Sequence, residues 1–307
     1  MIFGNVCYGW LVKKIPKTET SLLIRRTFSR LYKMKTTLKN LIPSPLWNFA
    51  RDTLITARHI PDLPSAYFHP WRKKSMDTLA ELKDKYRGER CFIIGNGPSL
   101  RDTEVSKLKD EYTFGMNRIY LAFEEWGFQT TFLVSVNNLV IEQCVDDLIA
   151  LNMPRFFSWR SRKYFQPSAF NLQPSNLPTF LYTTYDGMKF AEDVSRRVWE
   201  GATVTNICLQ LAYHMGFETA ILIGVDHSFK SKGEANKTIT SDGDDPNHFD
   251  PRYFGKGFRW QLPDLEMSEV AYRMARKAYE ADNRQILDAT IGGKLTIFKK
   301  ADYDRLF

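Results

Sequence analysis

The sequence predicts an α/β protein with a doubly wound, mostly parallel, Rossmann-like sheet and a basic helical N-terminal extension. Three observations support this prediction. From residue 90 onward, short apolar segments alternate with helical segments, as expected for parallel strands joined by crossover helices. The first apolar segment runs directly into a glycine-rich turn. Basic residues are concentrated in the first 80 positions, which hold fourteen Lys and Arg against four acids, whereas the rest of the chain is nearly neutral.

The composition limits the classes of protein that the chain can form. With 307 residues, of which 43% are hydrophobic, it can bury a sizeable core. No apolar run reaches the 18 residues that a membrane-spanning helix needs, so any membrane contact is predicted to be peripheral. The four cysteines, Cys7, Cys91, Cys144 and Cys208, lack a metal-binding spacing, and no secretory signal is recognisable. We therefore expect reduced thiols in a cytoplasmic protein.

Residues 1–84 are predicted to form a basic arm that contains an amphipathic helix. Between residues 21 and 42, apolar side chains recur three, four or seven positions apart, which places them on one helix face. They are Ile24, Phe28, Leu31, Leu38 and Ile42, with Arg25, Arg26, Arg30, Lys33, Lys35 and Lys39 between them. Such a helix can bind an anionic membrane surface at the inner face of the membrane or pack on the main domain, and both alternatives stay open. Nucleic acid is not expected as a partner, because base-stacking and groove-reading motifs are missing.

The main domain is expected to span residues 85–307, after prolines between positions 43 and 70 and a charged helix that ends near residue 88. The predicted strands are 90–95, 112–116, 131–136, 155–159, 180–184, 219–225 and, as the last one, 285–289. Helical segments are expected at 118–126, 138–151, 204–215 (amphipathic) and 266–282 (charged). Because ligands of such sheets bind at the carboxyl ends of the strands, Asn96, Asn117, Asn137 and Asp226 are predicted to be neighbours.

The turn formed by Gly95, Asn96, Gly97, Pro98 and Ser99 is typical of a nucleotide-binding loop. Glycines let backbone N–H groups approach a phosphate, and the next helix adds the positive end of its dipole. A dinucleotide-binding loop would have a third glycine at position 100 and an acid at position 117, but Leu100 and Asn117 stand there. The turn also lacks the lysine of a Walker loop. A tight strand-to-helix turn without a ligand is the alternative interpretation.

Other polar residues follow the predicted strands. The amides of Asn117 and Asn137 can donate to a phosphate, a ribose or a base edge, although either residue can equally be a helix cap. Asp226 can cap a helix, bind a sugar hydroxyl or support a histidine.

The polar segment 241–257 is predicted to be a long loop, either a substrate lid or a solvated surface loop. It contains His248, a candidate general base. Asp242, Asp244 and Asp245 have the oxygen ligands that cations prefer, but Pro246 and a missing glutamate break the pattern of a calcium loop. Magnesium held through a substrate phosphate is the remaining metal hypothesis.

Four segments resemble a known family, in the same order along the chain. They are CFIIGNGPSL, FGMNRIYL, GATVTNICLQLAYHMGFETAILIGVDHSF and NHFDPRYFGKG. They resemble the MptE-like family typed by archaeal 6-hydroxymethylpterin diphosphokinase, in its branch from bacterial polysaccharide loci. The chain is also similar to motility-associated factor glycosyltransferases, and its first three segments resemble the bacterial family-42 sialyltransferases. The resemblance covers about residues 85–300 and leaves out the basic arm.

The resemblance to the sialyltransferases implies a nucleotide site for a CMP-sugar. It assigns donor binding to Gly95, Asn96, Gly97, Asn117 and Asn137. The neighbouring Pro98, Ser99, Thr203, Thr205, Ser228 and Tyr253 are further candidates for nucleotide binding. In those enzymes tyrosines bind the phosphate and a histidine acts as base. Here Ser228 replaces one expected tyrosine, and aligning Tyr253 with the other puts Lys256 at the position of the base, so His248 and Lys256 compete for this role.

The sequence and this resemblance therefore predict a glycosyltransferase that uses a nucleotide-activated sugar and a glycan acceptor in surface glycan biosynthesis, and the resemblance implies that the donor is CMP-linked. His248, Lys256 and Asp226 are its candidate catalytic residues, and no metal or other cofactor is expected. The alternative is a pterin-type diphosphokinase that uses ATP and magnesium, to which Asp242, Asp244 and Asp245 would contribute. A third possibility is a non-enzymatic docking protein on a nucleotide-binding fold.

Overall fold

The computed structural model describes residues 57, 60–165, 177–185, 189–231 and 233–307. Contacts divide the chain into two units, Met1–Pro61 and Asp62–Phe307, and the features below belong to the second unit. The helix expected at residues 21–42 lies outside the described residues. None of the helices in the described part of the chain is both long and apolar enough to cross a bilayer.

The helices are α4 (Leu63–Phe68), α5 (Pro70–Leu82), α6 (Phe123–Trp126), α7 (Asn138–Ala150), α9 (Val204–Met215) and α10 (Leu265–Ala281). Short 3₁₀ helices are η1 (Ile60–Asp62), η2 (Pro98–Asp102), η3 (Val105–Leu108), η4 (Ile119–Ala122), η5 (Trp159–Tyr164) and η7 (Tyr303–Leu306). The strands of the main sheet are β1 (Arg90–Ile94), β2 (Tyr112–Met116), β3 (Phe132–Ser135), β4 (Arg155–Ser158), β5 (Thr179–Leu181), β8 (Thr219–Ile223), β11 (Gln285–Asp288) and β12 (Lys299–Lys300). Two small sheets pair β6 (Thr183–Thr184) with β7 (Val198–Trp199) and β9 (Thr238–Thr240) with β10 (Arg259–Gln261).

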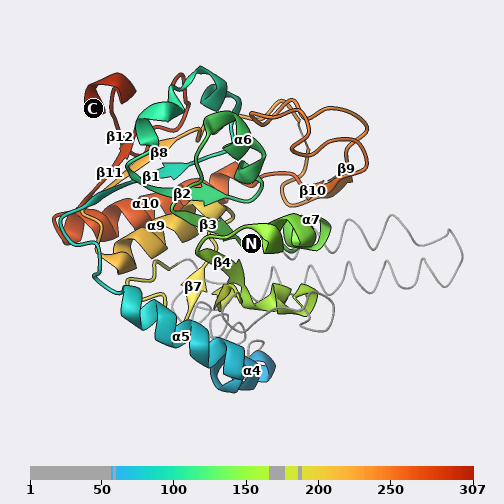
Figure 1. Cartoon of the computed structure of the whole chain (residues 1–307), viewed down its shortest axis with the longest axis vertical. Coiled ribbons are helices and arrows are strands. Elements are labelled where there is room, and N and C mark those ends of the chain that lie inside the picture. The colour runs from blue at the N-terminus through green and yellow to red at the C-terminus, as the bar shows by residue number, and fades with distance from the viewer. Residues whose placement is uncertain (1–56, 58–59, 166–176, 186–188, 232) are drawn as a thin grey trace, which may run out of the picture. The chain divides into compact units, whose positions relative to one another are not determined.

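The main sheet has eight parallel strands in the order β12-β11-β8-β1-β2-β3-β4-β5 (Figure 1). The chain fills one half of the sheet from β1 to β5 and the other half from β8 to β12. The strand order therefore reverses between β1 and β8, which is the place where doubly wound folds bind ligands. The predicted α/β class and parallel sheet are confirmed.

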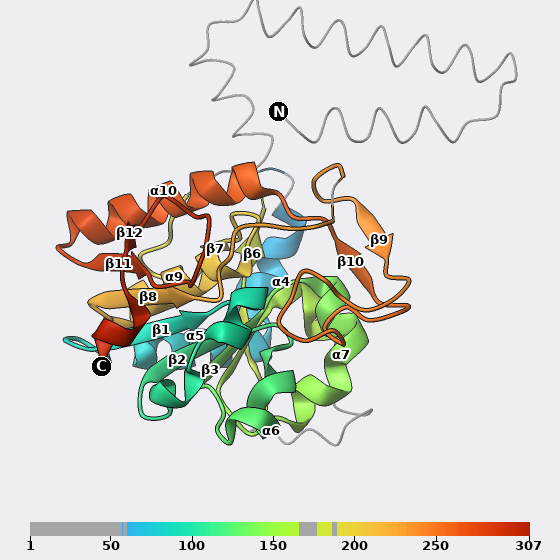
Figure 2. The same ribbon diagram turned by 90° about the horizontal axis from the view of Figure 1, so that it is seen from above.

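Two hydrophobic clusters cover the two faces of this sheet. In β1, Cys91 and Ile93 belong to the cluster that contains α9 and α10, whereas Phe92 and Ile94 belong to the cluster that contains α7. Figure 2 shows α9 and α10 on one side of the strands and α6 and α7 on the other. Alternate side chains of one strand are buried on both faces, which explains why the predicted strands are continuously apolar. Cys91, Cys144 and Cys208 are buried free thiols.

Helix α9 is not amphipathic, contrary to the prediction, because every residue from Thr205 to Met215 is buried. The polar residues that suggested a solvent-facing side form hydrogen bonds inside the protein. The Gln210 side chain donates to the Trp199 carbonyl at 2.7 Å, and His214 Nε2 lies 2.8 Å from the Leu79 carbonyl. A polar stripe on this helix thus anchors neighbouring loops rather than facing water.

The main unit begins at Asp62, whereas the sequence placed the boundary after residue 84. Helix α5, which the sequence assigned to the arm, is part of the core. Its Arg72 is fully buried and donates to the carbonyls of Ser195 and Arg196 at 2.6 and 2.9 Å. Leu79 is also fully buried. The charged residues of α5 masked this buried face in the sequence.

Three smaller predictions are also corrected. The expected strand 180–184 is split, because β5 pairs with β4 whereas β6 pairs with β7. The strand at 285–289 is not the last one, because β12 extends the sheet beyond it. The glycine turn leads into the five-residue 3₁₀ helix η2 and not into an α-helix. A 3₁₀ helix of this length has little macrodipole to offer a phosphate.

The segment 241–257 connects β9 to β10 and is packed against the rest of the protein. Tyr253, Phe254 and Trp260 form a small apolar cluster with Val140 of α7. The alternative of a solvated surface loop is therefore wrong. The position of this loop matters because it brings His248 to the sheet.

Candidate functional site

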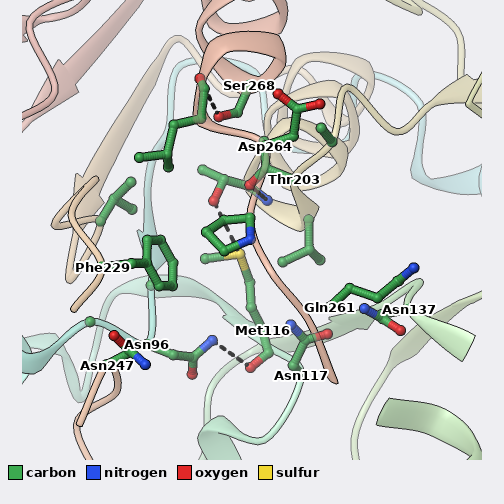
Figure 3. A pocket seen from close by; sticks show the side chains of 18 of the residues that line it. Asn96, Met116, Asn117, Asn137, Thr203, Phe229, Asn247, Gln261, Asp264 and Ser268 are labelled. Atoms are coloured by element: carbon green, nitrogen blue, oxygen red, sulfur yellow. Dashed lines mark hydrogen bonds between the residues drawn. The ribbon is translucent and has the colours of Figure 1, made fainter. Parts of the chain in front are cut away.

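A cavity of about 260 Å³ lies at the carboxyl ends of β1, β2, β3 and β8. Its walls also include the starts of α9 and α10 and part of the β9–β10 loop. Figure 3 shows Asn96 and Asn117 at one end, and Asp264 and Ser268 at the start of α10 at the other. The cavity contains these predicted site residues: Gly95, Asn96, Gly97, Asn117, Asn137, Thr203, Thr205, Asp226, Ser228, His248 and Tyr253. Of the predicted nucleotide-binding residues, Pro98 and Ser99 are outside its lining.

The glycine turn is used mainly for internal packing. A Cβ atom on Gly95 would lie 2.1 Å from the Gly224 carbonyl oxygen, so the glycine allows β1 and β8 to end close together. The backbone N–H of Gly97 donates to the same carbonyl at 2.8 Å. A Cβ atom on Gly97 would lie 1.8 Å from a carboxylate oxygen of Asp226. The small residues at this turn therefore have a structural cause that needs no ligand.

The Asp226 carboxylate accepts hydrogen bonds from Ser99 near the start of η2. Its carboxylate accepts from the backbone N–H of Ser99 at 3.1 Å and from the Ser99 hydroxyl at 2.7 Å. It contacts neither His227 nor His248, so the hypothesis that Asp226 supports a histidine is wrong. The predicted role as the N-cap of a following helix is also wrong, because residues 225–229 form no helix and the carboxylate binds Ser99 of η2 instead.

The two strand-end asparagines are held in place by hydrogen bonds and line the cavity. Asn117 has a left-handed φ of 51°, and its Oδ1 accepts from the Ser135 hydroxyl at 2.9 Å. Asn137 caps α7, because its Oδ1 accepts from the backbone N–H of Leu139 at 2.9 Å. In both residues the carbonyl oxygen is engaged, and the side chain of Asn117 also forms a hydrogen bond with Tyr253. Asn137 is thus both a cap and a part of the cavity wall.

His248 is oriented by a buried carboxylate. Its Nδ1 lies 2.6 Å from Asp245 Oδ2, and the Asp245 side chain is only 1% exposed. Because a carboxylate only accepts hydrogen bonds, Nδ1 carries the proton and Nε2 is left as the basic nitrogen. The ring also stacks on Tyr253, with centroids 4.0 Å apart and planes at 14°. This arrangement of a base and its orienting acid is typical of general base catalysis.

Hydrogen bonds stabilise the ionised form of the Asp245 carboxyl. Burial alone would raise the pKa of this carboxyl, but donors from His248 and from the backbone N–H groups of Asn247 and Phe254 keep its pKa below the ordinary value. Burial raises the pKa of Tyr253, so this phenol stays protonated beside the imidazole.

Two arginines, Arg101 of η2 and Arg118 after β2, fix the loop that carries His248. Arg101 donates to the Phe249 carbonyl at 2.5 Å and to the His248 carbonyl at 3.1 Å. Arg118 donates to the carbonyls of Arg252 and Tyr253. The backbone N–H of Phe249 also donates to the Asn96 carbonyl at 2.9 Å, which joins the loop to the glycine turn.

Other predicted residues are not brought to the site. Lys256 is exposed and does not line the cavity, so the structure does not support it as a base. Asp242 and Asp244 are exposed, whereas Asp245 is buried against His248. No three potential metal ligands cluster anywhere in the described residues. Magnesium held through a substrate phosphate stays a prediction.

Two threonines at the start of α9 are engaged with the protein. Thr203 caps the helix, and its Oγ1 accepts from the backbone N–H of Thr205 at 3.3 Å. The Thr205 hydroxyl lies 3.6 Å from the sulfur of Met116. Ser228 lines the cavity beside His227.

A second histidine pair at the cavity was missed from the sequence. His227 follows β8 with a left-handed φ of 53°, and its Nε2 lies 3.1 Å from Glu269 Oε1 on α10. Glu269 also accepts from Arg273 at 3.2 Å. These donors lower the pKa of Glu269 below the ordinary value. The sequence contained no signal for this pair, because 42 positions separate its two members.

A group of side chains around Arg160, at the edge of the cavity, was also missed. Arg160 donates to Glu200, to the Tyr185 hydroxyl and, at 2.8 Å, to the Val136 carbonyl. Burial would lower the pKa of Arg160, but the Glu200 carboxylate raises it, so the pair is ionic. Glu200 and Tyr185 line the cavity.

A comparison with protein-family models agrees with the predicted family. A family model described as 6-hydroxymethylpterin diphosphokinase MptE-like matches residues 71–232. No curated protein matches the chain. Among solved structures, a MAf glycosyltransferase from Magnetospirillum magneticum AMB-1 is similar, with 15% sequence identity and a TM-score of 0.42. This similarity covers 77% of the present chain and only 39% of the other, so the chain spans well under half of that protein.

The region matched by the family model contains the part of the cavity wall that the main sheet and α9 contribute. It includes the glycine turn, strands β1 to β8 and helix α9, and it ends before the loop that carries His248. Because the matched region covers more than half of the sequence, this chain belongs to the 6-hydroxymethylpterin diphosphokinase MptE-like family.

Proposed function

We propose that this protein is a glycosyltransferase that moves a sugar from a CMP-linked donor to the hydroxyl of a glycan acceptor during surface glycan assembly. The observation that carries this proposal is His248, whose Nδ1 is fixed by the buried Asp245 so that Nε2 is the basic nitrogen at a cavity wall. A base is what an acceptor hydroxyl requires before it can attack an anomeric carbon. The sequence resemblance to sialyltransferases supports the choice of a CMP-sugar as donor.

The reaction needs one proton acceptor and a stabilised leaving group. As the acceptor oxygen forms its bond to the anomeric carbon, its proton passes to Nε2 of His248. The bond from the anomeric carbon to the phosphate oxygen breaks, and its electron pair stays on the phosphate of CMP. Asp245 stabilises the imidazolium that forms, because its carboxylate accepts the hydrogen bond from Nδ1. In this proposal the side chains of Asn117 and Asn137, which line the cavity, contact the nucleotide.

The family name favours one alternative, a diphosphokinase that transfers pyrophosphate from ATP with magnesium. Such a transfer needs carboxylates that can hold a cation across adjacent phosphates. The acids that line the cavity are Glu200, Asp226 and Asp264. They are engaged with Arg160, with Ser99, and with the backbone N–H of Met267 and the side chain of Asn236, respectively. These contacts favour the sugar transfer over the pyrophosphate transfer.

The proposal is tested by the release of nucleotide from a panel of donors. CMP-, UDP- and GDP-linked sugars and ATP are incubated with the full-length protein and extracts of surface glycan, in excess EDTA and in magnesium, and free nucleotides are measured by chromatography. We expect release of CMP in EDTA. Turnover of ATP to AMP that requires magnesium, together with no release from any sugar nucleotide, would contradict the proposal and support the diphosphokinase.

A further inference from the structure

The cavity has two ends, which different strands of the main sheet form. Phe229 follows β8 and Asn137 follows β3, and Figure 3 shows these two residues on opposite sides of the cavity. Because β8, β1, β2 and β3 are consecutive neighbours in the sheet, the two ends are three strand spacings, or roughly 14 Å, apart. The ring of His248 packs against Phe229 with centroids 6.2 Å apart. The candidate base therefore lies at the β8 end.

The end of the cavity at β3 and β4 is held together by Arg160, which follows β4. Arg160 donates to the Val136 carbonyl at 2.8 Å and to the Thr183 hydroxyl at 3.1 Å. It also donates to the carboxylate of Glu200 and to the hydroxyl of Tyr185. The centre of its guanidinium lies 4.4 Å from the centroid of the Tyr185 ring. These contacts fix an aromatic ring and a carboxylate side by side at the cavity wall.

Tyr185 and Glu200 offer a ligand two different kinds of contact. The Tyr185 residue is 54% exposed, although the guanidinium lies over its ring, so a flat aromatic surface is open to a ligand. The Glu200 side chain is only 5% exposed, and it lines the cavity. Hydrogen bonds from Arg160 and Tyr185 use part of the capacity of this carboxylate, which has about four lone-pair sites. Because a carboxylate only accepts, a ligand group that reaches Glu200 has to be a donor.

The charges of the lining indicate which part of a nucleotide fits this end. The described residues that line the cavity include three acids, Glu200, Asp226 and Asp264, and no lysine or arginine. A phosphate beside Glu200 would be repelled, whereas an uncharged ring with N–H donors would not. A nucleobase with an exocyclic amine has both features that the pair requires. Its face can stack on an aromatic ring, and acidic side chains accept hydrogen bonds from the N4 amine of cytosine.

We propose that Tyr185 and Glu200 bind the nucleobase of the donor and favour a base that carries an exocyclic amine. This inference rests on the proposed function and assigns its choice of cytosine. The N4 amine of cytosine donates to Glu200, whereas uracil presents a carbonyl oxygen at the same position and would place one acceptor against another. Arg160 acts as a positioning residue for both side chains. From this end, the nucleotide extends along the strand ends past Asn137 toward His248.

The test compares the affinities of the full-length protein for CMP and UMP by calorimetry. These nucleotides differ only in the base, so the ratio of their affinities isolates the exocyclic amine. We expect the wild type to bind CMP at least about tenfold more tightly than UMP. Glu200→Gln replaces the carboxylate by an amide, which can accept from cytosine or donate to uracil, so the ratio should fall to near one.

Variants of the aromatic ring test the stacking contact separately. Tyr185→Ala should weaken the binding of CMP and UMP by a similar factor of about tenfold and leave their ratio unchanged. Tyr185→Phe keeps the ring without the hydroxyl and should retain most of the affinity that Tyr185→Ala loses. This pair of variants tests the inference even if Glu200→Gln does not fold. Glu192→Gln is the control for charge, because Glu192 is exposed and outside the lining, and it should leave both affinities unchanged.

The outcomes distinguish this inference from the proposed function. The same measurements are made with AMP, whose base also carries an exocyclic amine. If AMP binds most tightly and loses its advantage over UMP in Glu200→Gln, the CMP donor is wrong and the role of the pair is supported. The inference is overturned if the wild type binds UMP as tightly as CMP and AMP, or if Glu200→Gln keeps the wild-type ratio. It is also overturned if Tyr185→Ala leaves nucleotide affinity unchanged and weakens only the binding of surface glycan, which would assign the pair to the acceptor.

Discussion

The glycine turn at residues 95–99 and the loop at residues 241–257 have opposite relations between sequence and structure. The turn carries the strongest sequence signal for a phosphate, yet its glycines pack against Gly224 and Asp226. The backbone N–H of Ser99, which could have bound a phosphate, donates to the Asp226 carboxylate instead. The loop looks like a solvated connection in the sequence, yet Tyr253 and Phe254 are buried and its His248 has a buried partner.

The difference shows that the composition of a segment does not reveal what its polar groups contact. A glycine between a strand and a helix is required equally by a ligand and by a neighbouring strand, because both need the space of a missing side chain. A polar loop becomes ordered when a few aromatic side chains anchor it and when arginines from elsewhere bind its carbonyls, as Arg101 and Arg118 do here. The following predictions test this comparison.

The largest effect is expected in the loop. His248→Ala should lower kcat by about 10²- to 10⁴-fold, because positioned general bases contribute this much, while the affinity for CMP survives. Lys256→Ala, in the same loop but exposed, should leave kcat nearly unchanged. Steady-state kinetics with the donor that the nucleotide-release assay identifies measures both. Loss of kcat in Lys256→Ala, together with a nearly unchanged kcat in His248→Ala, would reverse the assignment of the base.

In the turn, the largest effect is expected on stability. Gly95→Ala places a Cβ atom against the backbone carbonyl of Gly224, which cannot move without separating β1 from β8, so we expect a loss of about 3 kcal/mol in the free energy of unfolding. Gly243→Ala is the control, because nothing lies within 4 Å of its Cβ position. Urea unfolding measures the difference. A stable Gly95→Ala that has lost only nucleotide affinity would restore the turn as a phosphate loop.

Asp226 distinguishes packing from ligand binding at the same turn. Asp226→Asn keeps an oxygen for the backbone N–H of Ser99 but weakens the second hydrogen bond, so we expect a loss of about 1 kcal/mol in stability. If the phosphate binds elsewhere, the affinity for CMP should change by less than about threefold. A clear gain in CMP affinity, as expected when a repelling charge is removed from a phosphate site, would contradict this account of the turn.

The smallest expected effect is on the pH dependence of protein stability, through the carboxylate of Asp245 in the loop. Because the pKa of Asp245 is lower in the folded protein than its ordinary value of 3.8, its carboxylate contributes stability that is complete above that value. This contribution is lost as the pH falls through the folded-state pKa. Between pH 5 and 3, unfolding in urea should therefore show a smaller loss of stability for Asp245→Asn than for the wild type, with the exposed Asp244→Asn behaving like the wild type. Identical slopes for all three proteins would contradict the prediction.

The sequence predicted most of the fold because the sheet is parallel and buried on both faces. Continuous apolar segments such as those of β1 and β8 have few other structures available, and the intervening helices fix a crossover topology. The errors occurred where a polar pattern had two possible causes. Gln210 and His214 on α9 looked solvent-facing but bind buried carbonyls, and the charged α5 hid the core residue Leu79.

The sequence by itself determined the family, the α/β class and the strand ends at which Asn96, Asn117 and Asn137 meet, because these depend on local patterns that recur along the chain. Only the tertiary structure decided which groups act together. Asp245 is the partner of His248, Glu269 on α10 lies against His227, and Asp226 accepts from Ser99. The physical reason is that hydrogen bonds between side chains from different elements depend on distances and directions that packing sets, and a linear sequence does not encode these locally.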